Sequence, residues 1–102
     1  MQTGRIRHTV AFSLRHEPGS QAAEAFLAEG SRELAAIPSV RDFECLRQVS
    51  PKNGFQYGFS MEFDDEDGYA AYNEHPRHVA FVEQRWVPEV SDFLEADFVA
   101  HG

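Results

Sequence analysis

The chain has few of the residues that build disulfides, thiolate metal sites or nucleic-acid surfaces. Cys45 is the only cysteine among 102 residues, which excludes an intramolecular disulfide and a zinc site made of several thiolates. Lys52 is the only lysine, and nine basic residues face 17 acidic ones, giving a formal net charge of −8. Because nucleic acids and anionic membranes attract clustered Lys and Arg, this balance predicts no nucleic-acid partner and no membrane partner.

Long apolar runs are also missing. No segment approaches the ~20 apolar residues of a membrane span, and residues 1–7 contain no apolar signal-peptide core. We therefore expect a cytoplasmic protein. Residues 1–102 suit a single domain, and an apolar content of 42% with nine phenylalanines predicts a folded core rather than disorder.

The strands are predicted from alternation of apolar and polar side chains. Residues 5–14 and 55–63 alternate clearly, with the period of two that is typical of half-buried strands. Residues 40–49 repeat the pattern more weakly, and residues 93–99 are the final strand. The turn residues at 50–54 predict a hairpin between the second and third strands.

The helices are predicted from caps and apolar spacing. Ser20 is suited to cap a helix that ends before Pro38. A short helix capped at residue 64 or 65 is followed by the His75-Pro76 step, and a new helix occupies about residues 77–87. We expect His75 to brace this break between the helices.

The order strand-helix-strand-strand-helix-strand is the ferredoxin-like βαββαβ pattern. It predicts an α+β fold with a four-stranded antiparallel sheet and helices on one face. The other face is predicted to carry small residues, namely Thr9, Ala11, Ser13, Gly58 and Ser60. Small side chains let a second sheet approach closely, so we expect the chain to be its own partner in a two-fold homodimer, sheet to sheet.

Three segments resemble the stress-responsive dimeric α/β-barrel (Dabb) domain family. They are residues 6–12 (Ile-Arg-His-Thr-Val-Ala-Phe), residues 37–40 (Ile-Pro-Ser-Val) and above all residues 72–82, which contain a His-Pro-x-His-x-x-Phe motif. Asp97 before Phe98 also fits the closing strand of that family, and the resemblance covers residues 5–99. It implies a dimeric α+β barrel formed by two ferredoxin-like chains.

The functions known in this family are mixed. Many members have no assigned reaction, and some plant members are stress-induced. One member is a cyclase that closes a linear polyketide by intramolecular aldol condensation without a cofactor. The resemblance to it implies that His78 and Tyr72 are an acid–base pair and that His8 corresponds to its strand-one histidine. This chain departs from it with Tyr57 in place of a histidine and Gly30 in place of a tyrosine, so the identity of the reaction does not carry over.

The residues themselves also predict a pocket between sheet and helices. His8 and Tyr57 lie on the apolar faces of two predicted strands, and a few polar groups in an apolar hollow are typical of ligand pockets. We predict His78 as general base and Tyr72 as its orienting or oxyanion partner. The residues predicted to line the binding site are His8, Tyr57, Gly30, Phe26 and Phe81.

The expected ligand is a small, largely apolar molecule, with no cofactor and no metal. Glu74, His75 and His78 are the only clustered metal-ligand candidates, and Pro76 interrupts their helical spacing. Gly30 has two explanations that the sequence leaves open: close packing of its helix on the sheet, or space for the ligand.

Three functions stay open at this point. The first is a cofactor-free acid–base enzyme of the polyketide cyclase type. The second is a non-catalytic stress-response or structural dimer with core histidines, which predicts a filled interior. The third is a haem-binding or oxygenase-type relative of the same barrel.

Overall fold

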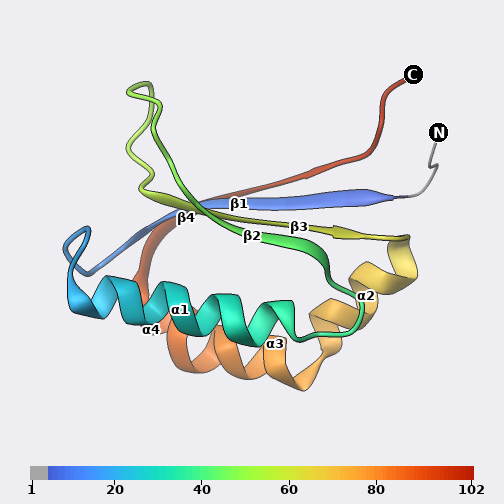
Figure 1. The fold of residues 1–102 in the computed structure, drawn as a ribbon, viewed down its shortest axis with the longest axis horizontal. Coiled ribbons are helices and arrows are strands. Elements are labelled where there is room, and N and C mark those ends of the chain that lie inside the picture. The colour runs from blue at the N-terminus through green and yellow to red at the C-terminus, as the bar shows by residue number, and fades with distance from the viewer. Residues whose placement is uncertain (1–4) are drawn as a thin grey trace.

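The computed structural model describes residues 5–102 and contains a four-stranded antiparallel sheet with its helices on one face (Figure 1). Residues 1–4, the start of the segment expected to lack a signal-peptide core, lie outside the description. The strands are β1 (Ile6–Leu14), β2 (Arg41–Arg47), β3 (Tyr57–Phe63) and β4 (Val90–Phe98). Their order is β2-β3-β1-β4, which confirms the predicted ferredoxin-like α+β fold.

The helices are α1 (Gln21–Ala35), α2 (Glu66–Glu74), α3 (Pro76–Phe81), the π-helical turn η1 (Val82–Trp86) and α4 (Val87–Glu89). The caps are side chains that satisfy free backbone N–H groups at the helix starts. Ser20 Oγ accepts from the Ala23 N–H at 3.2 Å, and Asp65 Oδ1 accepts from the Gly68 N–H at 2.8 Å. None of the helices in the described part of the chain is both long and apolar enough to cross a bilayer.

The break between α2 and α3 occurs at the predicted step. His75 accepts the Arg77 N–H through Nδ1 at 3.1 Å and so caps α3, which confirms that this histidine braces the break. The helical run that follows is longer than the predicted residues 77–87, since it starts at Pro76 and reaches Glu89 through η1.

Three of the predicted strand ends were wrong by two or three residues, and the others agree to within one residue. β2 stops at residue 47 and β3 starts at residue 57, so the connecting loop is longer than the predicted 50–54, and it rises from the sheet on the side away from the helices (Figure 1). The Gln48 side chain donates to the Phe55 carbonyl at 2.7 Å and closes the base of this loop. β4 begins at residue 90, three residues earlier than predicted.

The core lies between the sheet and the helices. Every second residue of β1, from Ile6 to Leu14, is buried on the helix side, as the alternation predicted. Phe12 and Phe26 are fully buried, and their rings belong to an aromatic cluster with Tyr57, Phe59 and Trp86. This cluster fixes α1 and η1 over the centre of the sheet.

The opposite sheet face is open. The strand registers place Leu46 beside Gly58 and Leu94 beside Ala11 on this face. Ala11 and Gly58 are half-buried and small, whereas Leu46 and Leu94 are exposed apolar side chains at the flanks.

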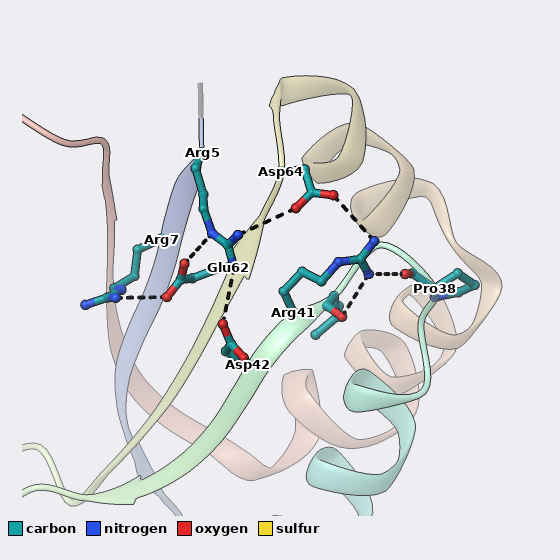
Figure 2. A network of polar contacts seen from close by, with 8 residues as sticks. Arg5, Arg7, Pro38, Arg41, Asp42, Glu62 and Asp64 are labelled. Atoms are coloured by element: carbon teal, nitrogen blue, oxygen red, sulfur yellow. Dashed lines mark hydrogen bonds and ion pairs between the residues drawn. The ribbon is translucent and has the colours of Figure 1, made fainter. Parts of the chain in front are cut away.

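An ion-pair network closes the end of the sheet where β1 begins (Figure 2). Glu62 pairs with both Arg5 and Arg7, and Arg5 also reaches Asp42 at 3.2 Å. These guanidinium groups hold the pKa of Glu62 below its usual value. Asp42 adopts a positive φ of 50° where the β2–β3 register shifts, so the bulge turns its carboxylate toward Arg5.

Candidate functional site

A pocket of about 360 Å³ lies between the helix-facing side of the sheet and the segment from α2 to α4. Aromatic and aliphatic side chains form most of its wall, including Phe59, Met61, Phe81 and Trp86. Six polar side chains from β1, α2, α3 and β4 also line it, namely His8, Tyr69, Tyr72, Asn73, His78 and Glu95. A pocket of this volume, with a mostly apolar wall and a few polar side chains, is typical of a small-molecule site.

His78 presents an unprotonated ring nitrogen. Its Nδ1 lies 3.1 Å from the Asn73 carbonyl oxygen, which can only accept, so Nδ1 carries the hydrogen and Nε2 is the acceptor. The His78 ring is partly buried, and the loss of water around it lowers its pKa below the ordinary value. The imidazole is therefore neutral near pH 7 and is able to accept a proton.

Tyr72 supplies a protonated phenol next to that imidazole. The two ring centroids are 4.4 Å apart, and Tyr72 is only 3% exposed. Burial raises the pKa of Tyr72 well above its usual value, so the hydroxyl keeps its hydrogen. Within residues 5–102, this hydroxyl has no hydrogen-bond partner, which leaves it available to a bound molecule.

His8 is held by two partners from other elements. Its Nδ1 lies 2.6 Å from Asp97 Oδ1 and 2.9 Å from the Tyr69 hydroxyl, while that hydroxyl donates to Asp97 Oδ2 at 2.9 Å. Asp97 is the register partner of His8 on β4. Because a carboxylate accepts the Nδ1 hydrogen, a neutral His8 has its Nε2 lone pair free. Burial, followed by the hydrogen bond to Asp97, raises the pKa of Tyr69.

The structure brings four of the seven predicted site residues to one pocket, namely His8, Tyr72, His78 and Phe81. Tyr57 does not reach it. It lies on the same face of β3 as the lining residues Phe59 and Met61, but two residues beyond Phe59 on the side away from Met61. Its hydroxyl instead accepts the Gly19 N–H at 3.3 Å.

Phe26 and Gly30 also lie outside the lining. Phe26 packs in the aromatic cluster described above. A Cβ added at Gly30 would lie 2.8 Å from the Phe59 ring and 3.0 Å from the Phe81 ring. Close packing of α1 on these rings therefore explains the glycine, and space for a ligand does not.

Tyr69 is one of three polar pocket residues, with Asn73 and Glu95, that the sequence did not single out. It lies one helical turn before Tyr72 on α2, and this spacing of three is the signal that places both on one face. Asp97 was noted only as fitting the family, and its pairing with His8 depends on the β1–β4 register.

Two other types of reactive site find little support in the described residues. Between residues 5 and 102 no three His, Cys, Asp or Glu side chains are grouped to hold a metal ion. Cys45 is an exposed residue, but partial desolvation of its thiol raises the pKa, which keeps it protonated and a poor nucleophile.

Distant solved structures share the fold of this chain. The hydroxynitrile lyase from Passiflora edulis is 12% identical, with 96% of this chain and 94% of that chain covered and a TM-score of 0.83. A variant of SnoaB, a cofactor-independent oxygenase from Streptomyces nogalater, is 15% identical over 96% and 94%, with a TM-score of 0.73. A dimeric ferredoxin-like protein from Thermobifida fusca is 24% identical over 98% and 95%, with a TM-score of 0.80.

Nearer relatives are similar in sequence as well. A stress-response A/B barrel domain-containing protein of Arabidopsis thaliana is 50% identical over 85 residues, which are 79% of this chain and 74% of that protein. The crystal structure of a Dabb family protein from Mesorhizobium loti is 54% identical, covering 97% of this chain and 99% of that chain with a TM-score of 0.96. The family profile of the stress responsive A/B barrel domain matches residues 6–100. The chain therefore belongs to the stress responsive A/B barrel domain (Dabb) family.

Proposed function

We propose that this protein is a homodimeric, cofactor-independent acid–base enzyme that binds a small, largely apolar carbonyl compound. The observation that carries the proposal is the neutral His78, with Nδ1 tied to the Asn73 carbonyl, next to the unpartnered Tyr72 hydroxyl in one pocket. A pocket of this size also favours this function over a non-catalytic dimer, which needs a filled interior at the same place.

The proposed reaction starts with proton transfer from carbon to nitrogen. His78 Nε2 takes a proton from a carbon next to a carbonyl group, and the electron pair of the broken C–H bond moves onto the carbonyl oxygen. Tyr72 donates a hydrogen bond to that enolate oxygen, as an oxyanion donor does. In a cyclisation, the enolate carbon then attacks a second carbonyl of the same molecule, and the new alkoxide takes the proton back from His78.

His8 has a positioning and lining role in this proposal. Asp97 and Tyr69 fix its ring orientation from two elements, and its centroid lies 6.0 Å from that of Tyr72. The free Nε2 of a neutral His8 offers a hydrogen-bond acceptor to a donor group of the substrate. The pocket thereby orients a molecule between two imidazoles.

Loss of the Tyr72 hydroxyl is expected to slow enolisation by about 10²–10³, because the enolate oxygen loses its donor. The measurement is deuterium exchange into ethyl acetoacetate in D₂O, followed by proton NMR, for the wild type and Tyr72→Phe. Tyr57→Phe is the matched control, since it removes a phenol oxygen that lies outside the pocket. Equal rates for wild type and Tyr72→Phe, or an equal loss in Tyr57→Phe, would contradict the role of Tyr72. No acceleration over protein-free buffer would favour the non-catalytic dimer.

The homodimer is proposed from the open sheet face. Small residues lie at its centre, exposed Leu46 and Leu94 flank it, and burial of this apolar surface would stabilise a short chain. The dimeric neighbour from Thermobifida fusca is consistent with this arrangement. Light scattering is expected to give twice the chain mass of 11.6 kDa, and Ala11→Arg on this face is expected to give the monomer mass. A monomeric wild type would contradict the proposal.

A further inference from the structure

The pocket carries negative charge and no permanent positive charge in its described lining. The side chains lining it within the described chain include no lysine and no arginine, whereas Glu95 contributes a carboxylate. The second carboxylate nearby, Asp97, is already engaged by His8 and Tyr69. Even a protonated His8 would be balanced by Asp97, so the excess negative charge comes from Glu95.

Glu95 lies where the pocket opens. It is the β4 register partner of the buried Val10, which places its side chain on the helix side of the sheet between Phe93 and Asp97. The residue is exposed and also lines the pocket, so it is part of the entrance. No hydrogen bond or ion pair engages its carboxylate from residues 5–102, which leaves it free to meet a ligand.

The inner end of the pocket provides a second, independent feature. Tyr72 is buried as a residue, and its hydroxyl has no partner within residues 5–102, so it can donate to a carbonyl oxygen. Glu95 also acts electrostatically on this end, because its charge contributes to raising the pKa values of Tyr69 and Tyr72. A ligand therefore meets a donor at the inner end and a negative charge at the entrance.

We propose that Glu95 is a specificity residue that admits neutral or cationic ligands and rejects free carboxylates. This inference rests on the proposed function, because it concerns the ligand of the same pocket. An anion placed a few ångströms from Glu95 would gain no compensating salt bridge, since no guanidinium or ammonium lines the wall. A hydroxyl or ammonium group near the entrance would instead donate to the free carboxylate.

The proposal restricts the chemistry of the natural substrate. Its carbonyl group reaches the pocket as a ketone, aldehyde, ester or thioester rather than as a free acid. The reaction that precedes this enzyme must then supply its product as a ketone, an aldehyde, an ester or a thioester. A free carboxylic acid is a molecule that the pocket binds weakly.

The test uses three probes that share a phenyl ring and a two-carbon linker but differ in charge: phenethylamine, phenethyl alcohol and hydrocinnamate. Trp86 is the only tryptophan of the chain and lines the pocket, so its fluorescence reports binding. Each probe is titrated at neutral pH and low salt into the full-length wild type, Glu95→Gln and Glu17→Gln. The last variant removes the same unit of charge from an exposed turn outside the pocket lining.

The wild type is expected to bind the amine at least about tenfold more tightly than hydrocinnamate, with the alcohol between them. Glu95→Gln is expected to reduce this ratio to about twofold, whereas Glu17→Gln retains it. Hydrocinnamate binding as tightly as the amine in the wild type would overturn the role of Glu95. An unchanged ratio in Glu95→Gln, or an equal drop in Glu17→Gln, would overturn it too.

The two levels of the proposal fail in different ways. If none of the three probes changes Trp86 fluorescence in a saturable manner, the pocket is not a small-molecule site, and the proposed function fails with it. If the neutral alcohol binds but charge makes no difference, the proposed function stands and only the assignment of Glu95 fails.

Discussion

Replacing His78 with alanine is expected to lower the rate of deuterium exchange into ethyl acetoacetate by about 10²–10⁴ at pH 7. This is the range that one well-placed general base contributes. His8 also lines the pocket, and its Nε2 is free in the neutral ring, but its centroid lies 6.0 Å from that of Tyr72, against 4.4 Å for His78. His78 is therefore the imidazole next to the oxyanion donor. The rate is measured by NMR as for the Tyr72 variant, with circular dichroism to verify that the variant is folded.

A matched control separates the catalytic role of His78 from a structural one. His101→Ala removes the same ring from an exposed position near the end of the chain and is expected to leave exchange unchanged. His78→Gln retains a polar side chain of similar reach but offers no basic nitrogen, so its rate is expected to fall as far as that of His78→Ala. Full exchange activity in His78→Gln would contradict the assignment of this residue as the base.

The pH dependence gives a second readout of the same base. Burial lowers the pKa of His78, so its neutral form persists to lower pH than in a free histidine. Exchange is expected to be constant near neutral pH and to fall as the pH drops through a value below 6.5, the ordinary pKa of histidine. This acid limb is expected to disappear in His78→Gln. An acid limb retained in that variant would assign the titration to another group.

Local patterns predicted the features that depend on neighbouring residues. The alternation of β1 placed His8 on the buried face. The pair of Tyr72 and His78 came instead from the family resemblance, and the two rings lie together in the structure. The caps at Ser20 and His75 also follow from side chains within three residues of the backbone groups that they bond. Such contacts are determined by the chain within one turn of a helix.

Tyr57 and Tyr69 show where the local patterns are insufficient. Alternation predicts the face on which Tyr57 lies, but not where a helix crosses the strand, and here the crossing leaves Tyr57 outside the pocket. The role of Tyr69 depends on Asp97, which is paired with His8 across 89 residues of sequence. That pairing follows from the order of the strands in the sheet and has no local signal.

Phe12→Ala is expected to reduce the free energy of unfolding by about 3–5 kcal/mol, the usual cost of removing a fully buried phenylalanine. Phe12 is completely buried on β1, the strand between β3 and β4, and its ring touches both sheet and helix aromatics. Its centroid lies 4.8 Å from that of Phe59 and 5.0 Å from that of Trp86. Because small domains are stable by only about 5–15 kcal/mol, this single change removes a large share of the total.

Urea unfolding at a fixed protein concentration measures this loss, since a dimer makes the apparent stability depend on concentration. Phe12→Leu keeps most of the volume and is expected to lose less than about half as much, which provides a folded variant if the alanine protein does not fold.

Phe93→Ala makes the same deletion at a ring that is 49% exposed and contacts Trp86 from β4. Its expected loss is about 1 kcal/mol, because half of the ring already lies in water. An equal loss in Phe12→Ala and Phe93→Ala would mean that the ring at position 12 does not anchor the helices, and that the pocket beside the aromatic cluster rests on other contacts.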